Sequence, residues 1–591
     1  MNDVHVSRQT IMAELPPIKT QLHTLTTIAD LSGDGIMEIL DLADRLKPYI
    51  DAGCVPPFSP RREVPASMPA GTTAKKVKVT VSSNEATTRT GGTIVEAALA
   101  LGCEPVLFPA TNSKTAKGEG ELHDLIQHVI QHADLFACRT TLEGAPRYYA
   151  ESMQKFSEIL GRDDLVCAPI INMGDGSHGH PTQGLGDAGF LRQHYPTLTG
   201  FTLGLVGGIK LSRTGAEILR LAKIFGFKVK LYCQADQLPP ANLLEGVNWS
   251  FSSNWEGVGE CDVLYWIRPQ FERAAIDPVE YKRRMAVFRF APSVHRQCKP
   301  GVIHMHAQPI MEEGDLIPVF PGMYEVEGLD FSSIQKQADV MVRIRSSVMI
   351  VMWHNRRRGI TIPTPTTIIT RASERMRARA KMEELKRSRE KRRRAKKPEF
   401  FEPIAQGTLI DGLLPLDAVY GYLWLLRQGL LNIASFGIKA PILPLETKKF
   451  PDGWKGVIVL ENVVLAKEHM AAFQMAFPSA VWNVMSKGWF RKFQFTPDKL
   501  VFKEPATLNP LLPDGILPCP NHNCITNGCK QSHLPGFYIR RDLNDEMECR
   551  ICERLFIGQE IRQEIIDRLG PIDIPEFPKS GRVIMPFAIA T

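Results

Sequence analysis

Long apolar runs are absent from this chain of 591 residues. No stretch reaches the roughly 18 apolar residues that a membrane-spanning helix needs, which argues against a membrane protein. The first residues, MNDVHVSR, also lack the basic and then apolar order of a secretory signal peptide. We therefore expect a cytoplasmic protein without a membrane partner.

Excess charge is scarce outside one segment. The net charge is +7, but residues 371–397 contain 14 Lys or Arg and 4 Asp or Glu, which gives +10 for that segment. The remainder therefore carries 7 − 10 = −3. The segment has no Gly or Pro and is predicted to be a solvated linker helix. Nucleic-acid binding is the alternative, but interleaved aromatics are missing, so we expect no nucleic-acid partner.

The length and the 44% apolar content indicate a globular chain with several hydrophobic cores. Residues 76–81 alternate as a strand does, and a helix is predicted from residue 93 to 101. A second block begins near residue 202, with a helix predicted over 214–225 and a strand over 228–232. This alternation is typical of α/β domains with parallel sheets.

Twelve cysteines without a secretion signal indicate a reducing compartment, where metal binding is favoured over disulfides. Four of them near the end of the chain have the spacing C-x4-C, 24 residues, C-x2-C: Cys519, Cys524, Cys549 and Cys552. Two short cysteine pairs can supply the tetrahedral thiolates of one structural Zn²⁺ per chain. The alternative is a pair of disulfides.

One hydroxyl-rich segment joins a predicted strand to a predicted helix. Residues 85–92 read Glu-Ala-Thr-Thr-Arg-Thr-Gly-Gly and place three hydroxyls and a guanidinium beside the unpaired N–H groups of a helix start. Such a combination favours an anion. By itself the segment is also compatible with an ordinary capped helix.

Four motifs together resemble one family. Residues 87–90 (Thr-Thr-Arg-Thr), 180–183 (His-Pro-Thr-Gln), 206–214 and 262–270 stand in the order and spacing of its site segments. They resemble the phosphate loop, the His-Pro-Thr-Gln loop and the two acceptor-binding segments of the aspartate/ornithine carbamoyltransferases. The resemblance is closer to the aspartate branch and covers roughly residues 25–355.

The C-terminal part is similar to the regulatory chain of bacterial aspartate carbamoyltransferase, on residues 404–411 and 460–462 and on the cysteine spacing. The sequence therefore resembles a fusion of a catalytic and a regulatory chain. The fold implied is α/β, with two doubly wound parallel-sheet catalytic domains, an α+β nucleotide-binding-type domain and a small β zinc domain. A regulatory nucleotide, CTP or ATP, is implied as well, near Ile404, Asp411 and Lys455.

The resemblance implies domain limits. They are a tail at 1–25, a carbamoyl-phosphate domain at 26–195 completed by the helix 340–356, an aspartate domain at 196–339, a basic linker at 360–400, a regulatory domain at 401–505, a zinc domain at 506–560 and a tail at 561–591.

The activity implied is transfer of the carbamoyl group of carbamoyl phosphate to the aspartate amine, a step of pyrimidine biosynthesis. The family roles are phosphate binding, stabilisation of the carbonyl oxygen, orientation of the carbamoyl amide and clamping of the aspartate carboxylates. By motif matching, phosphate binding falls on Thr87, Thr88, Arg89, Thr90 and Arg139, and stabilisation of the carbonyl oxygen falls on His180 and Thr90. Orientation of the carbamoyl amide falls on Gln183. Clamping of the aspartate carboxylates falls on Arg213, Arg268 and Gln270.

In the family, a neighbouring chain lends a serine and a lysine to the site, and Ser113 and Lys117 stand at the matching places. Catalytic trimers and regulatory dimers, and hence a hexamer, are implied. The family's His-Pro-Leu-Pro-Arg segment is replaced by His304–Gln308 (HMHAQ). Two alternatives therefore stay open: a non-catalytic or weakly active binding or assembly protein, and a transcarbamoylase for another amine.

Overall fold

The computed structural model describes residues 17–571, with gaps at 65, 84–88, 109–131, 161–167, 271–276, 311–315, 318–331, 361–367, 371–372, 377–406, 429, 431–441, 447–453, 462, 487–488, 495–499, 503–510 and 529–534. The chain forms two compact units. The first comprises residues up to Pro363 together with 523–530, which contain α15 (Ile525–Gly528), and the second comprises 364–522 and 531–591.

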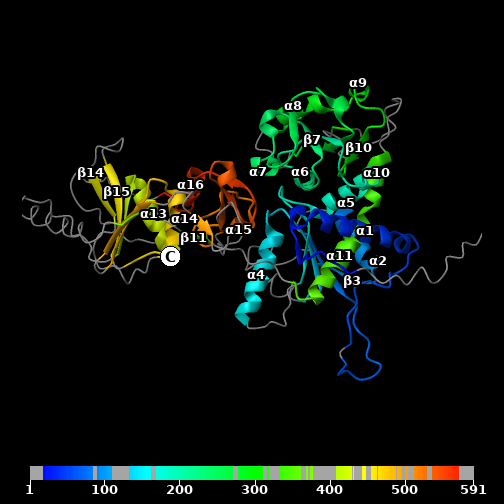
Figure 1. Cartoon of the computed structure of the whole chain (residues 1–591), viewed down its shortest axis with the longest axis horizontal. Coiled ribbons are helices and arrows are strands. Elements are labelled where there is room, and N and C mark those ends of the chain that lie inside the picture. The colour runs from blue at the N-terminus through cyan, green and yellow to red at the C-terminus, as the bar shows by residue number, and fades with distance from the viewer. Residues whose placement is uncertain are drawn as a thin grey trace, which may run out of the picture. The chain divides into compact units, whose positions relative to one another are not determined.

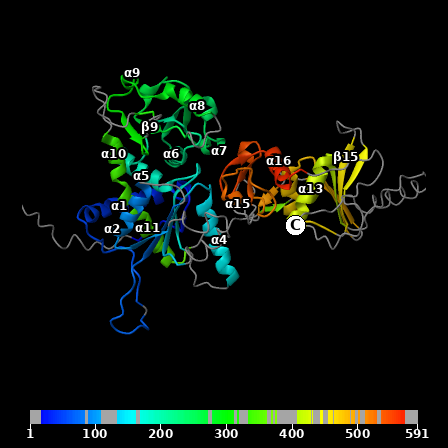
Figure 2. The ribbon, with the colours of Figure 1, turned by 180° about the vertical axis from the view of Figure 1, so that it is seen from behind.

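The first unit contains a five-stranded parallel sheet in the order β1-β5-β4-β2-β3. Helix α4 packs on β5 and β1, while α11 contacts both α1 and α2. Both views show α4 on one side of this sheet and the other three helices on the other (Figures 1 and 2). The elements are β1 (Thr24–Leu25), β2 (Lys78–Ser83), β3 (Glu104–Phe108), β4 (Leu135–Thr140), β5 (Ile170–Asp175), α1 (Gly33–Asp51), α2 (Arg89–Ala100), α4 (Ala145–Leu160), α5 (Pro181–Arg192) and α11 (Met341–Arg357).

A second parallel sheet of the same unit has the order β10-β9-β6-β7-β8. Its elements are β6 (Thr202–Gly207), β7 (Lys228–Tyr232), β8 (Trp249–Ser252), β9 (Val263–Ile267), β10 (Ile303–His306), α6 (Arg213–Phe225), α7 (Ala241–Leu244), α8 (Pro278–Met285), α9 (Pro292–His295) and α10 (Ser332–Asp339). The expected pair of parallel-sheet domains is therefore confirmed.

One apolar core runs through both sheets. It joins residues such as Val79 and Leu135 of the first sheet to Leu203 and Val263 of the second. Central strands of parallel sheets are buried on both faces, and all five residues of β9 are buried accordingly. A shared core holds the two sheets in one geometry, so the ends of their strands can build one site.

The second unit is a six-stranded antiparallel sheet, β12-β17-β16-β13-β15-β14, with α13 packed on β15 (Figure 2). A small three-stranded sheet, β19-β20-β21, precedes α16. The elements are β11 (Ile368–Thr370), β12 (Ser373–Met376), β13 (Gly407–Leu413), α13 (Pro415–Arg427), β14 (Ile442–Glu446), β15 (Trp454–Glu461), α14 (Lys467–Ala476), β16 (Val481–Ser486), β17 (Trp489–Gln494), β18 (Leu500–Phe502), β19 (Phe537–Arg540), β20 (Glu546–Cys549), β21 (Leu555–Phe556) and α16 (Gly558–Leu569).

Three sequence-based expectations differ from this fold. Residues 373–376 form strand β12 rather than part of a linker helix, because β17 supplies an antiparallel partner that the local sequence does not reveal. The expected N-terminal tail is part of the first unit from residue 17 on, since Ile18, Leu22 and Leu25 are buried. The expected C-terminal tail begins inside α16, which continues to Leu569.

Within the part of the chain that the structure describes, no helix combines the length and the apolar content needed to cross a membrane.

Candidate functional site

A cavity of about 860 Å³ opens in the first unit where the carboxyl ends of strands from both sheets meet. Ligands of open α/β sheets bind at this edge. Eight of the residues expected in the site line this cavity: Arg89, Thr90, Arg139, His180, Gln183, Arg213, Arg268 and Gln270. Thr87, Thr88, Ser113 and Lys117 lie outside the described residues.

The first turn of α2 forms one wall of the cavity. Arg89 and Thr90 begin this helix, and the Thr93 hydroxyl donates to the Arg89 carbonyl oxygen at 2.8 Å. Arg139 comes from β4, the neighbour of β2 in the sheet. Helix N–H groups and two guanidiniums therefore surround this end of the cavity, as an oxyanion requires.

Arg345 of α11 also lines the cavity, and sequence reasoning did not select it. Its side chain is buried, and burial together with the nearby charges of Arg89 and Arg139 lowers its pKa to about 9. The charge of Glu96 opposes this shift. The position of Arg345 shortly before the apolar run 348–353 (VMIVMW) was the available signal. An anion in the cavity would relieve the repulsion among these arginines.

His180 precedes α5 as its N-cap residue. Burial lowers the pKa of its imidazole well below the ordinary value, and the charges of Arg213, Arg139 and Arg345 lower it further. The ring is therefore neutral at neutral pH and can donate one N–H while its other nitrogen accepts. Its Nε2 lies 3.4 Å from the Thr90 hydroxyl and its Nδ1 lies 3.4 Å from the Thr182 hydroxyl.

Glu217 of α6 fixes the backbone that carries His180. Its carboxylate accepts from the His180 N–H at 2.8 Å and from the Ile28 N–H at 2.9 Å, and it is fully buried. Arg220 lies 3.5 Å from this carboxylate. Helix α6, which follows strand β6 of the second sheet, thus holds the loop that follows strand β5 of the first sheet.

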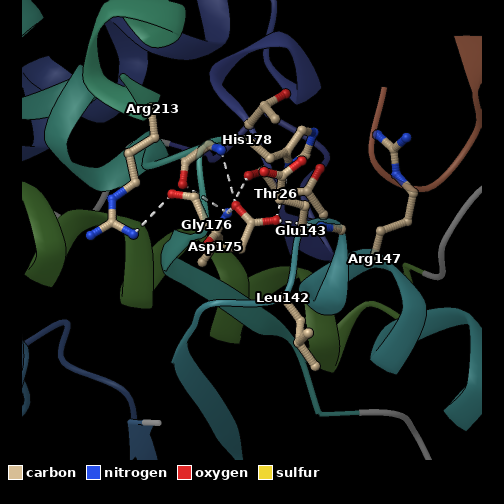
Figure 3. Close-up of polar contacts among 12 residues, drawn as sticks. Thr26, Leu142, Glu143, Arg147, Asp175, Gly176, His178 and Arg213 are labelled. Carbon is tan, nitrogen blue, oxygen red and sulfur yellow. Dashed lines mark hydrogen bonds and ion pairs between the residues drawn. The ribbon is translucent and has the colours of Figure 1, made fainter. Parts of the chain in front are cut away.

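The polar loop between β5 and α5 is organised by Asp175, which lies at the centre of the contacts in Figure 3. Its carboxylate accepts from the side chain of Asn172 at 2.7 Å and from the backbone N–H groups of Gly144 and Gly179 at 2.7 and 3.0 Å. His178 Nδ1 lies 2.8 Å from the same carboxylate. These contacts fix the loop that precedes His180.

The same loop holds Arg213, which Figure 3 shows reaching toward Gly176. Its Nη1 donates to the Gly176 carbonyl oxygen at 3.2 Å. Gly174 has φ +121°, and a Cβ there would lie 2.8 Å from the Arg213 guanidinium carbon. A glycine is therefore needed where the loop passes this arginine.

Arg268 and Gln270 follow β9 and line the cavity. Gln270 is buried, and its amide donates to the Arg268 carbonyl oxygen at 3.2 Å. Gln308 lies in the loop after β10 and also lines the cavity. Its side-chain Oε1 accepts a hydrogen bond from Nη1 of Arg89, which begins α2. This contact joins residues 219 positions apart in the sequence.

Gln183 is held by a buried carboxylate. Its amide donates to Asp187 Oδ1 at 2.8 Å, and Asp187 also accepts from Tyr265 at 2.9 Å and from Gln337 at 2.6 Å. Burial raises the pKa of Asp187 to about 7 against the lowering effect of these three donors. Gln337 Oε1 in turn accepts from the backbone N–H of His306 at 2.9 Å.

The cavity lining is strongly basic. It contains five arginines, at positions 89, 139, 213, 268 and 345, and two carboxylates, Glu96 and Asp339. Guanidiniums in a partly enclosed space bind oxyanions through paired N–H donors. The chemistry of the cavity therefore suits a ligand, or a pair of ligands, with several negative charges.

The four cysteines near the end of the chain converge. The sulfur atoms of Cys519, Cys524, Cys549 and Cys552 lie within 4.8 Å of one another, and all four residues are buried and free of disulfides. The distance between the sulfurs of Cys519 and Cys552 is 3.7 Å. Thiolates about 2.3 Å from a tetrahedral Zn²⁺ are separated by similar distances, so these residues fit a structural zinc site.

Two of the expected nucleotide-binding residues contact each other in the second unit. Lys455 Nζ lies 2.6 Å from Asp411 Oδ1, and both side chains are partly buried. Ile404 lies outside the described residues.

Two family models match separate parts of the chain. The aspartate/ornithine carbamoyltransferase carbamoyl-P binding domain matches residues 23–193. The aspartate carbamoyltransferase regulatory chain metal binding domain matches residues 514–562 and therefore contains all four clustered cysteines.

Curated relatives of the chain are aspartate carbamoyltransferase catalytic subunits. The protein of Korarchaeum cryptofilum is 31% identical over 269 residues, which are 45% of this chain and 83% of the relative. That of Clostridium perfringens is 30% identical over 273 residues, 45% of this chain and 82% of the relative. Among solved structures, aspartate transcarbamoylase from Trypanosoma cruzi in complex with carbamoyl phosphate and aspartate is 24% identical, with a TM-score of 0.47 over 57% of this chain and 99% of that one.

Proposed function

This chain belongs to the aspartate/ornithine carbamoyltransferase family, and on that premise we propose that it is an aspartate carbamoyltransferase with a fused regulatory half. The observation that carries the proposal is one basic cavity lined by Arg89, Arg139, His180 and Arg268, which come from four separate segments. In the reaction, the aspartate amine attacks the carbonyl carbon of carbamoyl phosphate and a C–N bond forms. The C–O bond to phosphate breaks and phosphate leaves with the bonding pair. The proton that the amine loses passes to the departing phosphate, which leaves as the dianion.

The donor side of the site binds the phosphate. Arg89 and Thr90 act with the helix terminus of α2, together with Thr87 and Thr88, which precede them in the sequence. Arg139 contacts the phosphate and the carbonyl oxygen, and Arg345 adds a further buried positive charge. Binding at a helix terminus and to guanidiniums lowers the free energy of the leaving dianion.

The carbonyl oxygen gains negative charge in the transition state. The neutral imidazole of His180 and the hydroxyl of Thr90 donate to it, and a neutral donor needs no proton exchange with solvent. Gln183, held by Asp187, orients the carbamoyl amide. Catalysis then results mainly from positioning and electrostatic stabilisation.

The acceptor side binds the dicarboxylate. Arg213 and Arg268 each present a planar fork that fits a carboxylate, and Gln270 completes this wall. Arg213 is anchored to the loop that carries His180, so the acceptor and the carbonyl group are aligned by the same backbone.

A colorimetric assay for carbamoyl-aspartate on the purified full-length chain tests the proposal. Arg89→Ala is expected to lower kcat/KM for carbamoyl phosphate by roughly 100-fold or more, because a charged contact with the leaving group is lost. Arg268→Ala is expected to raise KM for aspartate without changing the affinity for phosphate. Arg283→Ala, an exposed arginine on α8 that pairs with Glu280, is the matched control.

Three other outcomes identify different functions. Turnover with ornithine but not with aspartate would assign the chain to another acceptor amine. Absence of turnover in a folded protein that still binds a bisubstrate phosphonate would indicate a binding subunit. Unchanged activity in both arginine variants would contradict the assignment of the site.

We extend the proposal to the second unit. The six-stranded domain would bind a regulatory nucleotide near Asp411, Lys455 and Ile404, and the four-cysteine domain would hold one structural Zn²⁺. The domain limits expected from the sequence are part of the same proposal, with the end of the N-terminal tail and the start of the C-terminal tail corrected, and so is a cytoplasmic location.

The oligomeric state is inferred from Ser113 and Lys117, the two residues that a neighbouring chain would contribute to the site. If Ser113 and Lys117 act across an interface, the catalytic half must form at least a trimer, and paired regulatory halves would produce a hexamer. Mass measurement in solution is expected to give six chains per particle. A monomer with full activity would contradict this arrangement, and so would unchanged kinetics in Lys117→Ala.

A further inference from the structure

We propose that Gln308 is a positioning residue for Arg89: its side-chain amide holds the donor-site guanidinium from the opposite wall of the cavity and leaves the outer edge of that guanidinium for the phosphate. The inference rests on the proposed function, because it assigns Arg89 to the phosphate.

The guanidinium of Arg89 needs a hydrogen-bond acceptor. Its guanidinium is partly buried, and burial lowers the pKa of Arg89 because the charged form loses hydration. Arg345 also lines the cavity, and the charges of Arg345 and Arg89 repel each other. A buried cation without an acceptor is costly, and Gln308 Oε1 accepts from its Nη1.

The second step is the rigidity of Gln308. Its backbone N–H donates to His306 Nδ1 at 2.8 Å, and its side-chain Nε2 lies 3.4 Å from the Ile334 carbonyl oxygen. The residue has φ +51°, in the left-handed region that side chains other than glycine seldom adopt. Both ends of the amide group are therefore engaged, and the acceptor oxygen points at Arg89 in a fixed direction.

The third step is the geometry of the fork. A guanidinium has five N–H donors in one plane, and a bidentate contact with an oxyanion uses two adjacent ones. Gln308 takes Nη1, so the edge formed by Nε and Nη2 stays available for phosphate. A neutral amide performs this role without placing a negative charge beside the phosphate, as a carboxylate would.

The contact also connects the two sheets. Gln308 follows β10 of the second sheet, while Arg89 begins α2 beside β2 of the first. A change in the loop after β10 would therefore reach the phosphate-binding arginine directly, through one hydrogen bond.

The test compares Gln308→Met with the wild-type chain. Methionine has a similar length but no strong acceptor, so phosphate is expected to bind roughly tenfold more weakly by calorimetry with inorganic phosphate, as for the loss of one hydrogen bond to a charged group. KM for carbamoyl phosphate is expected to rise by a similar factor. Gln308→Glu is expected to weaken phosphate binding further at pH 8. Gln297→Met, at an exposed position, controls for the substitution itself.

A double-substitution cycle separates positioning from general stability. In the Arg89→Ala background, Gln308→Met is expected to change kcat/KM for carbamoyl phosphate by less than about twofold, because its effect passes through Arg89. Equal effects in both backgrounds would overturn the inference, as would wild-type phosphate affinity in Gln308→Met or in Gln308→Glu. A wild-type chain that binds no inorganic phosphate would overturn the proposed function as well.

Discussion

At the residue scale, packing sets the protonation states of the site. His180 and Asp187 are both buried, and burial shifts each pKa toward the neutral form: down for the imidazole and up for the carboxylic acid. A neutral imidazole donates a hydrogen bond without titrating near pH 7. A carboxyl group with pKa about 7 holds Gln183 and Gln337 in either form, because both donate to Oδ1.

Asp187 predicts a pH dependence of stability. Its pKa is 3.8 in the unfolded chain and about 7 in the folded protein, so the folded state binds more protons between these values. The contribution of Asp187 to the free energy of unfolding is therefore full below about pH 4 and is lost as pH rises through 7. The Asp187→Asn variant has no group at this position that titrates, so it does not lose this contribution as pH rises. The difference in the free energy of unfolding, variant minus wild type, is therefore expected to increase by on the order of 1–3 kcal/mol from pH 5 to pH 8.

Urea unfolding of the full chain at several pH values measures this difference. Asp51→Asn, at an exposed carboxylate of α1, controls for the substitution itself. Parallel stability curves for wild type and Asp187→Asn would contradict the assigned protonation.

At the element scale, the loop between β5 and α5 is the link between the two sheets. Asp175 fixes the loop from within, Glu217 fixes its end from α6, and Gly176 anchors Arg213. The residues assigned to carbamoyl phosphate and those assigned to aspartate thus both depend on the loop between β5 and α5.

Gly174→Ala tests this link. The added methyl would meet the Arg213 guanidinium at 2.8 Å, so Arg213 must move and KM for aspartate is expected to rise by about tenfold or more. Gly200→Ala is the matched control, because φ is +78° there and no atom lies within 4 Å of the added Cβ. Steady-state kinetics that show the same change in both variants would mean that backbone strain, and not Arg213, is responsible.

At the scale of the whole molecule, a small sheet depends on a metal ion. The four clustered cysteines are all buried, and Cys549 ends the short strand β20 of this sheet. A small domain built on such a cluster usually depends on its ion to fold. The indole N–H of Trp424 donates to the Ile516 carbonyl oxygen at 2.8 Å, so α13 is in contact with the segment that leads to Cys519.

Zinc removal is expected to loosen this region. Dialysis against a chelator at neutral pH should make the four clustered thiols reactive to a thiol reagent, and should shift the tryptophan emission to longer wavelength as Trp424 is exposed. Cys54→Ser, at an exposed cysteine outside the cluster, should lower the thiol count in both states equally. A protein as isolated that contains no metal and has unreactive thiols would contradict a zinc site.

The sequence by itself determined the class of fold, the zinc ligands and the family. Helix 214–225 and strand 228–232 were predictable because caps and side-chain periodicity act over a few neighbouring residues. The cysteine spacing determined the metal site for the same reason, since each pair lies within one turn.

Only the tertiary structure decided how distant segments meet. Arg345, Asp187 and Gln308 have no local motif. Arg345 and Gln308 line the cavity, and Asp187 holds Gln183 there, because sheet register and a shared core bring α11, α5 and the loop after β10 together. The same reason explains β12, whose partner strand lies more than a hundred residues away. Local patterns specify elements, whereas burial and pairing between remote elements place the side chains that bind and react.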